Sequence, residues 1–296
     1  DAALLAINAG VDIETPIGSS YKHLIELVKT GRLESRVIDA AVARVLREKF
    51  ELGLFENPYV SAKNVVDLVG TKKTRDLALR AAEQAIVLLK NENNTLPLDV
   101  KKLKSIAVIG PHVHETLLGG YSDVPKQTVS ILQGIKNYVG PKVQVNYAQG
   151  TLITLDKWVS DVDTIAANSR SKERWNNDKV ELATPADTQG MIDAAVAAAQ
   201  KSDVAVVVVG DNEATSREGW AESHIGDRTD LNLVGQQQEL VDAVLATGKP
   251  TVVILNNGRP LSIAKIAKDA PAIIEAWYLG QETGTAIART LFGDVN

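Results

Sequence analysis

The sequence SREGWAESHIGDR, which begins at Ser216, gathers groups that can move protons or hold a sugar. Glu218 and Glu222 stand four residues apart, with Trp220 between them. A carboxyl group beside an aromatic face loses hydration, which disfavours its charged form and raises its pKa, so such a group can donate a proton near neutral pH. Trp220 could equally stack on a sugar ring. These residues alone support a proton-donating site and a solvated charged loop equally well.

Three other kinds of site find little support in the sequence. A nucleotide cofactor is not expected, because no Gly-x-Gly-x-x-Gly pattern follows Gly110 or Gly210 and no Gly-x-x-x-x-Gly-Lys-Ser/Thr pattern occurs. His112 and His114 are expected to be ordinary loop histidines, because no third metal ligand stands at a recognisable spacing. A serine hydrolase elbow, Gly-x-Ser-x-Gly, is missing. The sequence therefore predicts neither a cofactor nor a bound metal.

The elements around this loop predict an α/β fold. Apolar runs rich in Val and Ile predict strands over 105–110, 143–147, 204–210, 251–255 and 272–277. Helical spacing alternates with them over 129–138, 189–200, 235–246, 263–268 and 283–291. This alternation predicts an open, mostly parallel sheet with helices on both faces. Functional groups are then expected in loops beyond the carboxyl ends of the strands, which include the loop after Gly210.

The first part of the chain has a different pattern. Apolar spacing predicts only helices in the first 55 residues, and Gly53 and Pro58 break that pattern. We therefore expect a linker over 54–70, followed by a long amphipathic helix over 72–89.

Composition excludes several classes of partner. Basic and acidic residues number 32 and 37, which gives a net charge of −5, and no stripe of Lys or Arg could track a phosphate backbone. No run approaches the ~20 apolar residues that span a bilayer. Neither a nucleic acid nor a membrane is therefore expected as a partner. The chain has no cysteine, so disulfides are excluded.

Several segments together resemble glycoside hydrolase family 3, the β-glucosidase and β-xylosidase type. They follow the family's order along nearly the whole chain: AGVDIE from Ala9, FELGLFENPY from Phe50, IVLLKN from Ile86, AVIGP from Ala107, LGGYS from Leu118, DRTDL from Asp227, WYLGQE from Trp277 and LFGD from Leu291. The resemblance implies that 1–53 is the end of a (β/α)8-like barrel domain, 54–70 an interdomain linker and 71–296 an α/β sandwich that carries the acid/base loop.

The resemblance also implies a reaction and residue roles. In this family a barrel aspartate attacks the anomeric carbon, and a glutamate of the second domain protonates the leaving oxygen and then activates water, as a retaining double displacement requires. Many relatives place that glutamate in a Ser-x-Glu-Gly-aromatic context, which Glu218 fits. Glu222 is the alternative, because a shorter loop counted back from Asp227 would select it. Trp220 and Tyr121 are expected to line the sugar pocket.

The family's nucleophile lies in a Ser-Asp-Trp segment that these 296 residues do not contain. We therefore expect this chain to supply the acid/base and to need the missing barrel portion of the same enzyme for the nucleophile. Asp12 belongs to the closing segment of the barrel in this comparison and is expected to form hydrogen bonds rather than to attack the sugar.

The implied substrates are oligosaccharides and aryl β-glycosides, hydrolysed from the chain end as glucosides or xylosides. The resemblance suggests a periplasmic or secreted enzyme, and the sequence itself leaves the compartment open. A noncatalytic carbohydrate-binding or interaction domain with the same sandwich fold is the alternative from another class. The N-acetylglucosaminidases of the family, many of which use a barrel histidine as the acid, are disfavoured by the Glu-Gly-Trp context of Glu218.

Overall fold

The computed structural model describes residues 1–119, 122, 125–155, 181–216, 218–219 and 226–296. The chain divides into two compact units, Asp1–Leu68 and Val69–Asn296. Their boundary falls within the linker that the sequence predicts over 54–70. The assignment of the first unit to the end of a barrel domain, and of 71–296 to the sandwich domain, stays a prediction.

The first unit is helical, as the sequence predicts. Its elements are α1 (Ala2–Asn8), η1 (Tyr21–His23), α2 (Leu24–Lys29), α3 (Ser35–Glu51), η2 (Ala62–Asn64) and α4 (Val65–Leu68). A small apolar core that includes Ile7, Leu27 and Ala41 holds α1, α2 and α3 together. Asp12 accepts hydrogen bonds from Arg44, with 2.6 Å between Nη2 and Oδ1 and 2.8 Å between Nε and Oδ2. Its carboxylate is therefore engaged in a bidentate ion pair, in agreement with the expected role.

The second unit is built on one six-stranded sheet. The strands are β1 (Val87–Asn91), β2 (Ser105–Ile109), β3 (Gln144–Ala148), β4 (Val204–Gly210), β5 (Thr251–Asn256) and β6 (Ala272–Glu275). Their order is β1-β6-β5-β4-β2-β3, and every neighbouring pair is parallel except β1 with β6. The predicted open, mostly parallel sheet is confirmed.

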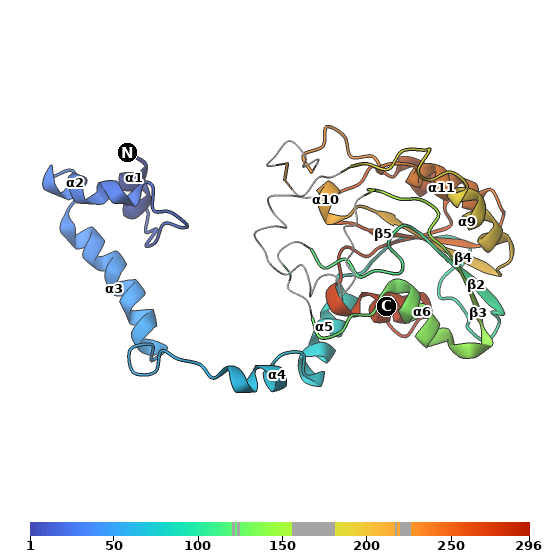
Figure 1. The fold of residues 1–296 in the computed structure, drawn as a ribbon, viewed down its shortest axis with the longest axis horizontal. Helices are drawn as coiled ribbons and strands as arrows, with labels where there is room; N and C mark the ends of the chain where they lie inside the picture. The colour runs from blue at the N-terminus through green and yellow to red at the C-terminus, as the bar shows by residue number, and fades with distance from the viewer. Residues whose placement is uncertain (120–121, 123–124, 156–180, 217, 220–225) are drawn as a thin grey trace. The chain divides into compact units, whose positions relative to one another are not determined.

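Helices cover both faces of this sheet (Figure 1). Alternate residues of each strand point to opposite faces. Ile106 and Val108 pack in a core with α5 (Lys72–Ala85), α6 (Ile131–Val139) and α13 (Thr283–Leu291). Ala107 and Ile109 pack in a second core with α9 (Met191–Gln200), α11 (Gln237–Leu245) and α12 (Ala264–Asp269). Short helices complete the unit: η3 (Gly140–Lys142), α10 (Glu213–Ser216) and η4 (Gly280–Glu282).

One predicted element is wrong over part of its length. The helix expected over 72–89 ends at Ala85, and Val87–Asn91 forms the edge strand β1. β1 pairs antiparallel with β6, with Val87 opposite Glu275 and Asn91 opposite Ala272. The apolar run after Ala85 is too short for its periodicity to separate helix from strand, so pairing with β6 decides its structure.

Candidate active site

The loops that follow β4, β5 and β6 meet at one edge of the sheet, because these three strands are parallel neighbours. Gly210 and Asn256 are the last paired residues of β4 and β5. A Cβ atom on Gly210 would lie 2.0 Å from the carbonyl oxygen of Asn256. Only glycine allows the two strand ends to approach this closely, so the chain leaves β4 directly beside the end of β5.

A buried amide fastens the end of β4 to α11. Gln237 is fully buried, and its Oε1 accepts a hydrogen bond of 2.8 Å from the backbone N–H of Gly210. Its Nε2 donates to the carbonyl oxygens of Gly210 and Val234, at 2.9 Å each. The backbone N–H and carbonyl groups of Gly210 both therefore have hydrogen-bond partners at the point where the loop that contains Glu218 begins.

The next turn, α10, is capped by its own sequence. Asn212 is buried, and its Oδ1 accepts a hydrogen bond of 3.1 Å from the backbone N–H of Thr215. The hydroxyl of Ser216, the last residue of α10, donates to the carbonyl oxygen of Asn212 at 2.9 Å. Glu218 follows two residues later and is exposed. A proton-donating carboxyl group must reach an external substrate, and this position allows it.

The other predicted site residues, Glu222, Trp220 and Tyr121, lie outside the described residues. Their contacts with Glu218 therefore stay predictions. Beyond them, the side chain of Arg228 is mostly buried, and its Nη2 lies 3.2 Å from Oδ1 of Asp230.

Sequence reasoning missed two buried carboxyl groups at the same edge. Asp211, directly after β4, is fully buried, and Glu275, the last residue of β6, is 8% exposed. Burial raises the pKa of both carboxyls above the ordinary range, against the effect of the hydrogen bonds that each accepts. The rule that polar groups gather beyond strand ends points to these positions. It does not separate a buried carboxyl from an exposed one.

The two loop histidines, His112 and His114, bind one carboxylate. Oε2 of Glu115 lies 3.2 Å from Nδ1 of His112, and Oε1 lies 3.2 Å from Nε2 of His114. Nδ1 of His114 lies 3.2 Å from the hydroxyl of Tyr147. Across the described part of the chain, no group of three or more His, Cys, Asp and Glu side chains is arranged to hold a metal ion.

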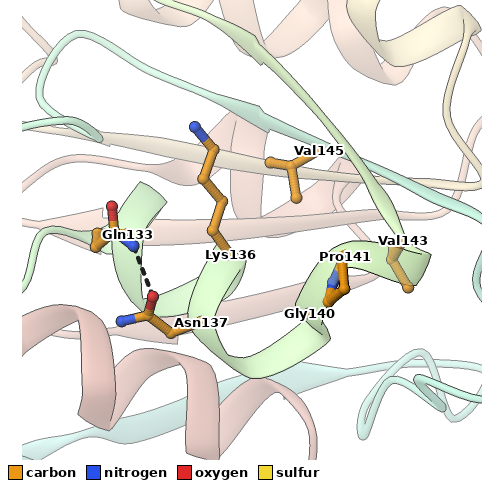
Figure 2. Close-up of a pocket in the computed structure, with 7 residues that line it drawn as sticks. All are labelled: Gln133, Lys136, Asn137, Gly140, Pro141, Val143 and Val145. Atoms are coloured by element: carbon orange, nitrogen blue, oxygen red, sulfur yellow. Dashed lines mark hydrogen bonds between the residues drawn. The ribbon is translucent and has the colours of Figure 1, made fainter.

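A surface pocket of about 520 Å³ lies elsewhere, between α6, η3 and β3 (Figure 2). Lys136 extends beside Val145 on one side of it, and Gly140 and Pro141 form the turn on the other. Gln133 donates a hydrogen bond to Asn137 at its rim. None of its lining residues belongs to the loops after β4, β5 and β6, so we do not assign the pocket to the candidate active site.

Residues 86–296 match the glycosyl hydrolase family 3 C-terminal domain. The chain belongs to glycosyl hydrolase family 3. The match begins just before β1 and includes all six strands of the sheet described above.

A β-xylosidase and a β-glucosidase match this chain along its full length. A β-xylosidase of Formosa agariphila is 40% identical over 311 residues, and a periplasmic β-glucosidase of Salmonella typhimurium is 37% identical over 305 residues. Both alignments include 100% of this chain but only 38% and 37% of the respective relatives. The chain therefore spans well under half the length of these family 3 enzymes.

Solved structures agree with the fold. A β-glucosidase from Erythrobacter marinus has a TM-score of 0.82 at 41% identity, covering 99% of this chain and 38% of that one. A β-glucosidase from Listeria innocua in complex with isofagomine has a TM-score of 0.73 at 28% identity, covering 99% of this chain and 36% of that one. These structural matches support the architecture described above for this chain.

Proposed function

We propose that this chain supplies the acid/base half of the active site of a retaining, exo-acting β-glycosidase, with Glu218 as the acid/base. The observation that carries the proposal is the place of Glu218 in a family 3 chain, exposed in the loop beyond β4 and two residues after the capped turn α10. Strand-end loops are where parallel sheets hold their reacting groups.

In the proposed reaction, two carboxyl groups act in sequence. An aspartate of the barrel portion attacks the anomeric carbon while Glu218 gives its proton to the glycosidic oxygen, so the carbon–oxygen bond of the leaving group breaks as the bond to the enzyme forms. The Glu218 carboxylate then accepts a proton from water, which attacks the anomeric carbon and releases the sugar with retained configuration. The aspartate must come from residues other than these 296, because they contain no Ser-Asp-Trp segment.

The proposed substrates are β-linked glucosides or xylosides, since the two relatives compared above are a β-xylosidase and a β-glucosidase. Trp220 and Tyr121 are proposed to contact the sugar. A periplasmic location is proposed from the printed name of the Salmonella relative. Among the described residues, no helix has both the length and the apolar character that a bilayer crossing needs.

The proposal is tested with two variants of the full-length enzyme, Glu218→Ala and Glu222→Ala, on aryl β-glucosides and β-xylosides. Glu218→Ala should lower kcat/KM roughly 10²- to 10⁴-fold on phenyl glycosides, because phenolate needs a proton to leave. It should leave kcat/KM on 2,4-dinitrophenyl glycosides nearly unchanged, because this leaving group needs no proton to depart in the first step. If Glu222→Ala has this pattern instead, Glu222 is the acid/base. Sugar binding without turnover by the full-length protein would favour the noncatalytic alternative.

A further inference from the structure

The carboxylate of Asp211 joins the ends of three strands. Asp211 follows β4 directly, and its Oδ1 accepts a hydrogen bond of 2.9 Å from the backbone N–H of Gly258, just after β5. The same oxygen accepts a hydrogen bond of 2.5 Å from the hydroxyl of Tyr278, just after β6. Oδ2 is buried and accepts no hydrogen bond from any described residue. The hydrogen bonds from these two donors to Oδ1 therefore take the place of hydration for this fully buried carboxyl group.

Tyr278 also contacts α10, the turn that precedes Glu218. Its hydroxyl lies 3.4 Å from Oγ of Ser216, the last residue of α10. The hydroxyl of Tyr278 donates its proton to Asp211, and the hydroxyl of Ser216 donates its proton to the carbonyl oxygen of Asn212. The two hydroxyl oxygens therefore touch each other without sharing a proton. The last residue of α10 thus packs against the Tyr278 hydroxyl.

Gly258 provides the space for this contact. A Cβ atom at Gly258 would lie 2.9 Å from Cε2 of Tyr278 and 3.4 Å from Oγ of Ser216. The tyrosine ring and the end of α10 therefore both pack on a position where the chain has no side chain.

We propose that Tyr278 and Asp211 are positioning residues for Glu218. They fix the end of α10, two residues before Glu218, against the ends of β5 and β6, and so hold the carboxyl group where it can reach the glycosidic oxygen. The role rests on the proposed acid/base function of Glu218. Neither side chain touches the substrate in this account.

The test is Tyr278→Phe in the full-length enzyme, with kcat/KM measured on phenyl and 2,4-dinitrophenyl β-glycosides. Misplacement of a reacting group by about 1 Å costs on the order of 100-fold. We therefore expect a loss of roughly 10- to 100-fold on the phenyl substrate and little change on the dinitrophenyl substrate, which does not need the proton. A residue that serves only the stability of the fold would lower both values equally.

Gly258→Ala provides an independent second variant, because its added methyl group would displace the Tyr278 ring from its place beside Ser216 without removing a hydroxyl. The same dependence on the leaving group is expected. Tyr138→Phe is the matched control, since the Tyr138 hydroxyl also donates to an aspartate, Oδ1 of Asp294 at 2.8 Å, but between α6 and the residues after α13. It should leave both rates at their wild-type values.

Equal losses on the two substrates in Tyr278→Phe, or no loss on either, would overturn the positioning role. Glu218→Ala, measured in parallel, separates the two claims. If Glu218→Ala loses activity only on the phenyl substrate while Tyr278→Phe does not, the positioning role alone is wrong. If Glu218→Ala shows no dependence on the leaving group, the acid/base assignment fails and the positioning role fails with it.

Discussion

Outside the proposed acid/base loop, the carboxylate of Glu115 lies between the side chains of His112 and His114. Burial opposes ionisation of this carboxyl, but the hydrogen bonds with His112 and His114 outweigh burial and lower its pKa to about 2. The hydrogen bond with Glu115 raises the pKa of His114, against partial desolvation. Glu115 and His114 therefore form an ion pair only over a limited pH range, in which the carboxyl is ionised and the imidazole is protonated.

The pH range follows from the sign of each shift. The Glu115 contribution is present above its ordinary pKa of 4.5 and is lost as the pH falls toward 2, where the folded-state carboxyl takes up a proton. The His114 contribution is present below its ordinary pKa of 6.5 and is lost as the pH rises through the raised value. We predict that Glu115→Gln lowers the free energy of unfolding by roughly 1–2 kcal/mol between the two ordinary pKa values, 4.5 and 6.5. The loss should be smaller at lower and at higher pH.

This prediction is checked by urea unfolding at a series of pH values. All four tryptophans of the chain, 158, 175, 220 and 277, belong to the second unit, so their fluorescence reports on that unit. Glu239→Gln, at an exposed position of α11, is the control and should show no such pH dependence. A loss that is constant from pH 4 to pH 9 would contradict the account of the cluster.

Residue types together with the family resemblance pointed to the proposed acid/base loop, but not to the buried groups Asp211 and Tyr278 behind it. Glu218 stands in a recognisable context, and its exposure in the structure agrees with the proposed role. Asp211 and Tyr278 are 67 positions apart, and only the strand order β6-β5-β4 brings them together. A pairing of this kind depends on topology, so single-sequence spacing could not have predicted it.

At the scale of elements, the contact between α6 and α13 depends on two glycines. A Cβ atom at Gly134 would lie 2.0 Å from the carbonyl oxygen of Gly284, and one at Gly284 would lie 1.9 Å from that of Ser130. The helix backbones are thus in direct contact, and this contact closes the core around Ile135 and Ile287 on one face of the sheet.

We predict that Gly134→Ala lowers the free energy of unfolding by about 2 kcal/mol or more. Helix propensity alone would favour alanine by about 1 kcal/mol, but the methyl group has no space and must separate the two helices. Urea unfolding monitored by tryptophan fluorescence measures the change. Gln133→Ala, at an exposed position of the same helix, should change the stability by no more than about 0.5 kcal/mol. A Gly134→Ala protein as stable as the wild type would show that α6 and α13 are not closely packed.

The strands that sequence predicted best are those that form continuous apolar runs. β2, β4 and β5 are buried Val- and Ile-rich strands, and their loops were located correctly. β1 was assigned to the end of a helix, since its pairing with β6 involves residues nearly 190 positions away and leaves no local signal. Local patterns thus predicted the centre of the sheet, and long-range pairing decided its antiparallel edge.

At the scale of the whole molecule, the chain matches well under half the length of its family 3 relatives. It spans 38% of the length of its β-xylosidase relative, and the reaction needs a second carboxyl group that we propose to lie in the barrel portion. The acid/base and the nucleophile would then come from two domains, so activity should require both. This division makes the role of Glu218 testable by chemistry that bypasses it.

The measurement that tests this account most directly is azide rescue of Glu218→Ala in the full-length enzyme, on a 2,4-dinitrophenyl β-glycoside. The activated leaving group allows the glycosyl-enzyme to form without an acid, and without Glu218 its hydrolysis is slow because water is not activated. Azide needs no base, so we predict that it restores turnover and that the product is the β-glycosyl azide, identified by NMR. No rescue by azide, or an α-glycosyl azide as the product, would contradict the assignment of Glu218 as the acid/base of a retaining enzyme.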